Sequence, residues 1–422
     1  MSVAPMQNTN KAVLSVDTKA RTFIEELARG EWDHPRTPFD ETMSRVMPSA
    51  ELHAVWQKLE ATAGPFRSVE EAHSQIQGDF QIVLVTCRFE HDLLVAKIVY
   101  DARDRIAGLF FLPAWTAPTY ANSDAWDEQD LKVGVNPALP GLLTLPKANG
   151  PFPAVVLVHG SGPMDEDESV GGVKMFKDLA WGLASRGVAV LRYEKRSRYA
   201  PSGIVTQKEE VLDGAHDAIE LLRHTRKIDI NELFVIGHSQ GGYLAPRIAR
   251  ANPNLAGIVI LAGSTRPLEE SLIDQLTYFA SLEPKNTKIA EALNAAEQFK
   301  QTVEDPNLRA EQDVAWPTGG RAKGAYFLDI RDYAPASAAQ ALSCRIFVLQ
   351  GERDYQVTMK DFDGWKRALT GNRAAVLKTY PRLNHLFVGG SGMSTPAEYQ
   401  QPGHVDEGVV SDISEWILRG RN

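Results

Sequence analysis

The chain has 422 residues, 43% hydrophobic and 23% charged, which is enough apolar material for a large core and more length than one domain usually has. Its net charge of −9 disfavours nucleic acid and anionic membranes as partners. Cys87 and Cys344 lie outside any metal-binding pattern, and the chain shows neither a secretory signal nor a membrane-spanning run, so we expect a cytoplasmic protein with no metal.

The first part of the chain predicts a small α+β domain over residues 17–113, after a loose tail at 1–16. Helical spacing of apolar residues extends over 16–32, 39–47 and 49–64, with Ser49 as the N-cap of the last helix. The period then becomes that of strands over 80–89, 93–100 and 105–112, which predicts a curled antiparallel sheet. Residues 114–129 lack any period and are predicted to be a linker.

The second part, residues 130–422, alternates buried strands with helices. Strand-like runs occupy 142–145, 154–158, 188–193, 233–236, 257–262, 345–349 and 375–380, and helical patterns occupy 175–186, 211–226 and the stretch that ends at 250. This alternation predicts the α/β class, with a mostly parallel sheet covered by helices on both faces.

One insertion, at about 264–340, interrupts the alternation with two helical patterns, at 268–282 and 288–304. It is too long for an ordinary connection, and loops at the carboxyl ends of parallel strands usually shape a pocket. We therefore expect a helical cap. The alternative is a packing element away from any site.

The most specific motif is Gly237-His238-Ser239-Gln240-Gly241, which follows a buried strand and precedes a helix. It matches the pattern G-x-S-x-G, in which a strained turn lifts a serine hydroxyl above the sheet. The elbow glycines, Gly237 and Gly241, are needed because the turn leaves no room for side chains. The motif predicts Ser239 as a nucleophile.

A serine nucleophile needs a base and an acid that orients it, and with this motif they follow in the order Ser, Asp or Glu, His. Asp354 comes just after the strand at 345–349, and His385 comes just after the strand at 375–380. We predict Asp354 and His385 as these partners. Glu352 is the alternative acid, and His404 is the alternative base.

The reaction also needs two N–H donors for the oxyanion. One donor is expected at the backbone of Gln240, and the other in the loop His159-Gly160-Ser161-Gly162-Pro163, with Ser161 first and Gly160 next. The acidic run at 165–168 fits a solvated face or a helix start better than a metal site. No cofactor is predicted.

The stretches 159–163, 165–168, 192–196, 237–242, 354–357 and 384–385 resemble bacterial α/β-hydrolases near the thermophilic carboxylesterases and the dienelactone-hydrolase-like proteins. The resemblance implies an α/β-hydrolase fold and esterase activity on short acyl esters. It also implies an N-terminal domain of unknown function, similar to nuclear-transport-factor-like α+β folds. The chain departs from the group at Glu166, where an Arg is common, and at Glu194, where an Asp is common.

The predicted function is that of a serine carboxylesterase that acts through an acyl-enzyme intermediate. An acyltransferase, a lactonase or a C–C bond-acting enzyme could use the same triad. A ligand-binding relative without catalysis is the third hypothesis, with the N-terminal domain as its ligand or dimer module. A homodimer is left open, and the substrate-binding residues are not predicted.

Overall fold

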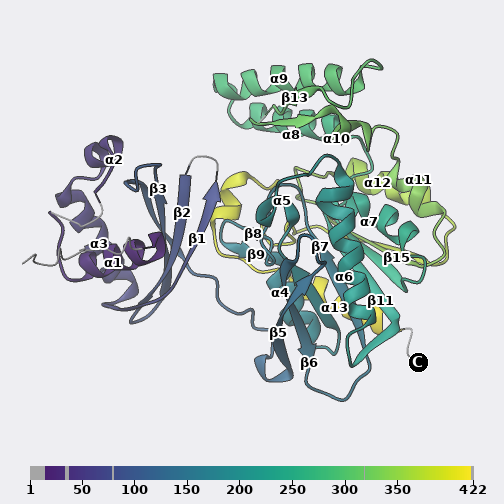
Figure 1. Cartoon of the computed structure of the whole chain (residues 1–422), viewed down its shortest axis with the longest axis horizontal. Helices are drawn as coiled ribbons and strands as arrows, with labels where there is room; N and C mark the ends of the chain where they lie inside the picture. The colour runs from purple at the N-terminus through teal and green to yellow at the C-terminus, as the bar shows by residue number, and fades with distance from the viewer. Residues whose placement is uncertain (1–14, 34–37, 78–79, 318, 420–422) are drawn as a thin grey trace, which may run out of the picture. The chain divides into compact units, whose positions relative to one another are not determined.

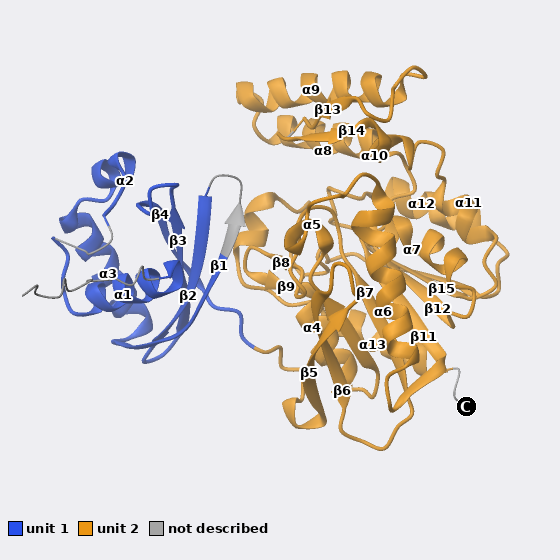
Figure 2. Cartoon of the chain, viewed as in Figure 1, with its two compact units in different colours: residues 1–116 blue, residues 117–422 orange. Residues whose placement is uncertain are grey.

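The computed structural model describes residues 15–33, 38–77, 80–317 and 319–419. The chain divides into two compact units, residues 1–116 and residues 117–422 (Figures 1 and 2). Of the predicted tail at 1–16, residues 1–14 lie outside the described residues. The predicted tail extends too far along the chain, because Ser15 caps the first helix and Val16 begins it.

The first unit has three helices and a four-stranded antiparallel sheet in the order β1-β2-β3-β4. The helices are α1 (Val16–Ala28), α2 (Glu41–Val46) and α3 (Ser49–Ala63), and the strands are β1 (Phe66–Gln77), β2 (Phe80–Phe89), β3 (Leu93–Tyr100) and β4 (Ile106–Pro113). Apolar side chains from α1 and α3 pack against β2 and β3 in one core that includes Phe23, Trp56, Val85 and Ile98. Ser49 is not the N-cap of α3, because Pro48 holds that position in extended backbone and Ser49 is already helical.

The predicted linker at 114–129 is too long. Strand β5 (Trp126–Val133) begins inside it and pairs along its whole length with β6 (Leu139–Pro146). Tyr120, which also lies within the predicted linker, packs against the core of the second unit. Its hydroxyl donates to the Val405 carbonyl at 2.8 Å. The strand was not predicted because most residues of this edge strand are charged or polar, as is typical of a loop.

The second unit contains an eight-stranded sheet in the order β16-β15-β12-β11-β7-β10-β6-β5. Its further strands are β7 (Phe152–Val158), β10 (Ala189–Tyr193), β11 (Ile228–His238), β12 (Gly257–Leu261), β15 (Arg345–Gly351) and β16 (Ala375–Tyr380). β5 and β6 are antiparallel to their neighbours, and the other neighbouring pairs are parallel. The carboxyl ends of the parallel strands therefore meet at one edge, where the loops that carry chemistry gather.

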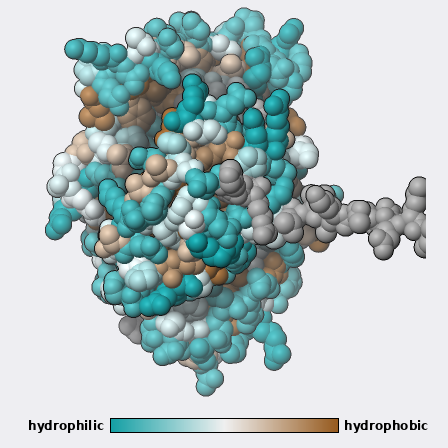
Figure 3. Space-filling model, turned by 90° about the vertical axis from the view of Figure 1, so that its left-hand side faces the viewer, coloured by the Kyte–Doolittle hydropathy of each residue, from teal (hydrophilic) through white to brown (hydrophobic). Residues whose placement is uncertain are grey.

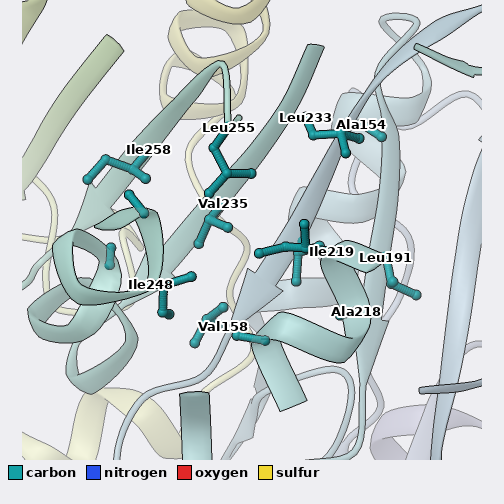
Figure 4. Close-up of a cluster of buried hydrophobic side chains, with 14 of the residues drawn as sticks. Ala154, Val158, Leu191, Ala218, Ile219, Leu233, Val235, Ile248, Leu255 and Ile258 are labelled. Atoms are coloured by element: carbon teal, nitrogen blue, oxygen red, sulfur yellow. The ribbon is translucent and has the colours of Figure 1, made fainter. Parts of the chain in front are cut away.

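Helices cover both faces of this sheet (Figure 1). Alternate residues of each central strand point to opposite faces, so in β7 Val156 and Val158 join one core while Val155 and Leu157 join the other. The first core is closed by α6 (Asp213–Arg223), α7 (Gln240–Ala251), α11 (Pro335–Gln340) and α12 (Met359–Leu369), and Figure 4 shows part of it. The second core is closed by α4 (Met175–Ala184) and α13 (Glu407–Leu418).

The insertion after β12 folds as a small helical layer. It contains α8 (Leu268–Leu282), α9 (Thr287–Glu304), a hairpin of β13 (Asp313–Ala315) and β14 (Arg321–Lys323), and α10 (Gly324–Leu328). It has a core of its own around Phe299, Val303 and Phe327. The remaining elements of the unit are short, namely η1 (Ser123–Ala125), β8 (Ser169–Val170), β9 (Val173–Lys174), α5 (Arg196–Tyr199), η2 (Lys208–Leu212) and η3 (Pro396–Gln400).

On the face drawn in Figure 3 hydrophilic residues predominate and hydrophobic residues form small groups. Among the helices of the described residues, none has both the length and the apolar character that a bilayer span requires.

Candidate active site

Ser239 occupies a sharp turn between the end of β11 and the start of α7. Its backbone has φ 51° and ψ −111°, a conformation that residues with a side chain rarely adopt and that costs about 1–3 kcal/mol. The turn is held by close packing on both sides: a Cβ at Gly237 would lie 2.2 Å from the Gly241 carbonyl oxygen, and one at Gly241 would lie 2.1 Å from that of Val158. Only glycine fits at 237 and 241, so the local sequence explains the strained serine.

His385 and Asp354 lie together beside this turn. The His385 Nδ1 and the Asp354 Oδ2 are 2.7 Å apart, and both residues are buried. Asp354 also accepts hydrogen bonds from the Gln350 side chain at 3.0 Å and from the backbone N–H groups of Gln356 and Val357. A carboxylate bonded on both oxygens is fixed in orientation, and it fixes the imidazole in turn.

The two alternatives from the sequence are engaged elsewhere. Glu352 is exposed, and its carboxylate accepts a hydrogen bond from the Thr379 hydroxyl at 2.7 Å. His404 pairs with the buried Asp178 at 3.1 Å. Asp354 and His385 are thus the acid and the histidine that this structure brings together.

The imidazole of His385 lies beside that of His238, the residue before Ser239. The two rings lie with their centroids 4.6 Å apart, and His238 Nε2 is 3.0 Å from the His385 carbonyl oxygen. Within the part of the chain that the structure describes, no hydrogen bond joins the Ser239 hydroxyl to His385. Such bonds commonly tighten only when a substrate is bound.

A buried ion pair, which the sequence did not reveal, lies behind the turn. His238 Nδ1 is 2.9 Å from Glu168 Oε1, and both side chains are buried. Burial alone would lower the pKa of His238, but the Glu168 carboxylate raises that pKa above its ordinary value. The same carboxylate accepts the Gly160 N–H at 2.7 Å. The acidic run at 165–168 therefore contributes a buried anion at 168 rather than a solvated face.

Two backbone N–H groups near Ser239 are unoccupied. Over the described ranges, neither the N–H of Ser161 nor that of Gln240 has a hydrogen-bond acceptor. Gly160, the alternative donor, is already bonded to Glu168. A Cβ at Gly160 would lie 3.3 Å from the Ser239 Cβ, so this loop packs directly against the serine. Two free donors beside a candidate nucleophile are the arrangement that stabilises an oxyanion.

Lys195 is a second buried charge that the sequence analysis did not assign. Its Nζ lies 2.7 Å from the Gly160 carbonyl oxygen, 2.6 Å from Gln240 Oε1 and 3.0 Å from Glu210 Oε1. Burial lowers the pKa of Lys195, and Glu210 opposes that effect. The only sign of this role in the sequence is the place of Lys195 in the stretch 192–196. A lysine that comes shortly after a buried strand can point toward the carboxyl edge of the sheet.

The insertion reaches both sides of the candidate site. Tyr326 of α10 contacts the Glu210 carboxylate and the Gln240 side chain, and Tyr278 and Phe279 of α8 pack against Tyr355, the residue after Asp354. A cavity of about 360 Å³ opens nearby, and Ser239, His385 and Asp354 do not line it. It is bounded by Glu352, Arg353, Pro381, Arg382, Gly390, Ser391, Gly392 and Met393. The described residues hold no cluster of three His, Cys, Asp or Glu side chains suited to a metal ion.

Comparison with known proteins adds two family matches. Residues 155–399 match the model described as "Alpha/beta hydrolase family", and residues 20–109 match "Protein of unknown function (DUF3887)". The chain is 36% identical over 410 residues to a protein named Esterase EstD from Thermotoga maritima, with 96% of this chain and 95% of that protein covered.

Solved structures are similar at lower levels. Est1E from Butyrivibrio proteoclasticus has a TM-score of 0.45 and 15% identity, over 69% of this chain and 98% of that one. A puromycin-hydrolyzing peptidase of Mycobacterium tuberculosis has a TM-score of 0.48 and 15% identity, over 84% of this chain and 48% of that one.

Proposed function

The chain belongs to the alpha/beta hydrolase family and is a serine ester hydrolase of the carboxylesterase type, and from this premise we propose that Ser239, His385 and Asp354 form its catalytic triad. The fold class predicted from the sequence is confirmed by the family match and by the mostly parallel eight-stranded sheet. The observation that carries the proposal is the strained Ser239 between β11 and α7, beside a His385–Asp354 pair with a spacing of 2.7 Å.

In the proposed reaction the Ser239 hydroxyl oxygen attacks the ester carbonyl carbon, and His385 Nε2 takes the hydroxyl proton. Asp354 accepts the Nδ1–H of His385, which fixes the imidazole tautomer and stabilises its cation. The carbonyl oxygen becomes an oxyanion, for which the Ser161 and Gln240 N–H groups are the proposed donors. When the C–O bond breaks, the alcohol leaves with the proton from His385, and water then releases the acid by the same steps.

The small-molecule ester substrate follows from the family and the relative, whereas the division of labour between domains is part of the proposal. Residues 17–113 form a separate domain, and catalysis belongs to the remainder, with the catalytic sheet beginning at Trp126 rather than at residue 130. We also propose a cytoplasmic protein, a setting compatible with the free thiols of Cys87 and Cys344. A homodimer is the assembly to test first, by the mass of the protein in solution.

The test is hydrolysis of p-nitrophenyl esters by Ser239→Ala. Loss of the nucleophile should lower kcat by about 10⁶-fold, as for other enzymes of this type, with an unchanged melting temperature. Ser337→Ala is the matched control, since Ser337 is an exposed serine on α11. A Ser239→Ala variant that retains more than a few per cent of the activity would exclude Ser239 as the nucleophile.

A further inference from the structure

The two peptide units on either side of the Gly160 Cα are each held by a buried charge, and the two charges are of opposite sign. On one side the Gly160 N–H donates to Glu168 Oε1 at 2.7 Å, and on the other the Gly160 carbonyl oxygen accepts from Lys195 Nζ at 2.7 Å. Both side chains are almost fully buried, at 1% and 2% exposure. Charge-assisted hydrogen bonds in such surroundings are strong, so the backbone at Gly160 has little freedom to turn.

Each of the two charges is itself fixed. An ammonium group has three protons, and Lys195 Nζ faces three acceptors, the Gly160 carbonyl, Gln240 Oε1 and Glu210 Oε1. Glu168 is held by His238, whose other ring nitrogen is bonded to the His385 carbonyl oxygen. Glu168 also has φ 47°, an unusual conformation for a residue with a side chain, which persists only where the surroundings enforce it.

The contacts of Glu168 and Lys195 with Gly160, called the clamp below, are linked to catalysis by the geometry of a planar trans peptide. The Gly160 C=O and the Ser161 N–H belong to one rigid plane and point in opposite directions, so a fixed carbonyl fixes the direction of the N–H. A cation on the carbonyl oxygen also polarises the peptide and strengthens its N–H as a donor. Lys195 also donates to the Gln240 side chain, so it contacts the peptide unit that carries one proposed oxyanion donor and the residue that carries the other.

We propose that Glu168 and Lys195 are positioning residues that hold the Ser161 and Gln240 N–H groups in the oxyanion-binding arrangement before the substrate arrives. Neither residue touches the substrate. Both act through the backbone of the loop at 159–163 and, for Lys195, through Gln240. The inference rests on the proposed function, because it assigns a preorganised oxyanion site to the Ser239 reaction. It also assigns a role to one residue in each of two sequence stretches, Glu168 in the acidic run at 165–168 and Lys195 in the stretch at 192–196.

The experiment removes the lysine without leaving a buried carboxylate unpaired. Lys195→Met is combined with Glu210→Gln, and Glu210→Gln alone is the reference, because it keeps the contact between Lys195 and Gly160. Relative to that reference, the double variant should lose about 10- to 100-fold in kcat on p-nitrophenyl butyrate, less than the 10²–10³ seen when a donor is deleted. KM should stay within about twofold.

The Ki of an inhibitor that forms a tetrahedral adduct distinguishes a positioning role from a merely structural one, because a structural role would leave this Ki unchanged. A trifluoromethyl ketone forms an oxyanion on the serine, so its Ki should rise by the same factor by which kcat falls, while the Ki of a planar amide analogue stays constant. Lys174→Met is the matched control: Lys174 pairs with Asp167 of the same acidic run at 3.0 Å and contacts neither Gly160 nor Gln240. Its kcat and Ki should equal those of the wild type.

One result overturns the proposal: a double variant whose kcat and ketone Ki match those of the reference, whether or not its melting temperature differs. Where the double variant does not fold, Glu168→Gln decides, because it is nearly isosteric and removes the anion from Gly160. It should lower kcat and raise the ketone Ki together, and unchanged values would overturn the proposal. These outcomes are read against Ser239→Ala: if that variant stays active the proposed function fails, and if it is inactive the clamp is tested alone.

Discussion

Two carboxyl groups in one loop, Asp354 and Glu352, differ in their surroundings. Asp354 is buried, accepts four hydrogen bonds from the protein and lies 2.7 Å from His385. Glu352 points outward to the Thr379 hydroxyl. A carboxylate can orient a histidine only if it is itself held, so the structure favours Asp354 for that role.

Substitution should separate the two carboxyl groups. Asp354→Asn should lower kcat by about 10⁴-fold, because an amide favours the wrong imidazole tautomer. Glu352→Gln, the matched control from the same loop, should change kcat by less than about threefold. Steady-state kinetics and thermal melting on both variants test this. If Glu352→Gln is the damaging change and Asp354→Asn is mild, the assignment of the acid is wrong.

Glu194 is expected to make the stability of the protein depend on pH. Burial and a hydrogen bond with Glu166 raise the pKa of Glu194 from an ordinary 4.5 to about 8, and Arg198, at 2.6 Å, opposes them. Because the folded state binds this proton more tightly than the unfolded chain, the contribution to stability is complete below about pH 4.5 and is lost as pH rises through 8. Glu166 and Glu194 are also the two departures from the resembling group.

Glu194→Gln replaces the protonated acid by an amide that does not titrate. Its urea midpoint should exceed that of the wild type by more at pH 9 than at pH 6, because only the wild type loses stability over that interval. Glu415→Gln, an exposed change on α13, serves as the control, with an offset that does not vary with pH. A Glu194→Gln offset equal at both pH values would show that Glu194 does not titrate in this range.

The sequence was informative about residues whose role depends on local context. Ser239 was predicted from its flanking glycines and the strand before it, and His385 and Asp354 were predicted from chain order and from their positions after strands. Glu168 and Lys195 could not be assigned in this way, because their partners lie far along the chain: Glu168 meets His238 across 70 residues, and Lys195 meets Gly160 across 35. One sequence does not show which distant residues meet.

At the scale of elements, periodic apolar residues predicted the helices and central strands closely. The strands β2, β3 and β16 and the helix α8 have the predicted bounds. Among the strands of the two large sheets, β1 and β5 were not predicted; they are the first strand of one sheet and the last of the other in strand order. An edge strand has one neighbour and one or both faces in water, so charged residues are tolerated and the strand pattern is lost.

The insertion divides its apolar side chains between two tasks. The ring of Trp316 stacks on that of Phe299, with centroids 5.3 Å apart, inside the core of the insertion. The ring of Phe279 instead lies 5.2 Å from that of Tyr355, the residue after the proposed acid. The helical cap expected over 264–340 is therefore reduced to α8 and α10. Residues of these two helices contact Tyr355 and Gln240.

This division predicts different effects on acyl preference. kcat/KM should rise with acyl length until the pocket is full, at up to about 0.8 kcal/mol for each buried methylene, and then fall. Phe279→Ala should move the optimum to a longer chain, whereas Trp316→Ala should lower the melting temperature and leave the optimum in place. p-Nitrophenyl esters of increasing length measure this. An optimum that moves only in Trp316→Ala would place the pocket on the other side of the insertion.

For the whole molecule, the alternation of buried strands and helices was enough to predict the α/β class and two domains. The boundary was harder, because the chain enters the catalytic sheet through the polar strand β5. All the contacts named for the candidate site lie within residues 117–422. The first unit matches a family of unknown function.

The most direct test of the central claim is to label the full-length protein with a fluorophosphonate and to map the adduct by peptide mass spectrometry. The account predicts one adduct per chain, on the peptide that carries Ser239, and none after Ser239→Ala. Lys195→Met with Glu210→Gln should label at the same serine but more slowly, because the adduct forms through the same oxyanion site. An adduct on any other serine, or no adduct on an active enzyme, would contradict the account.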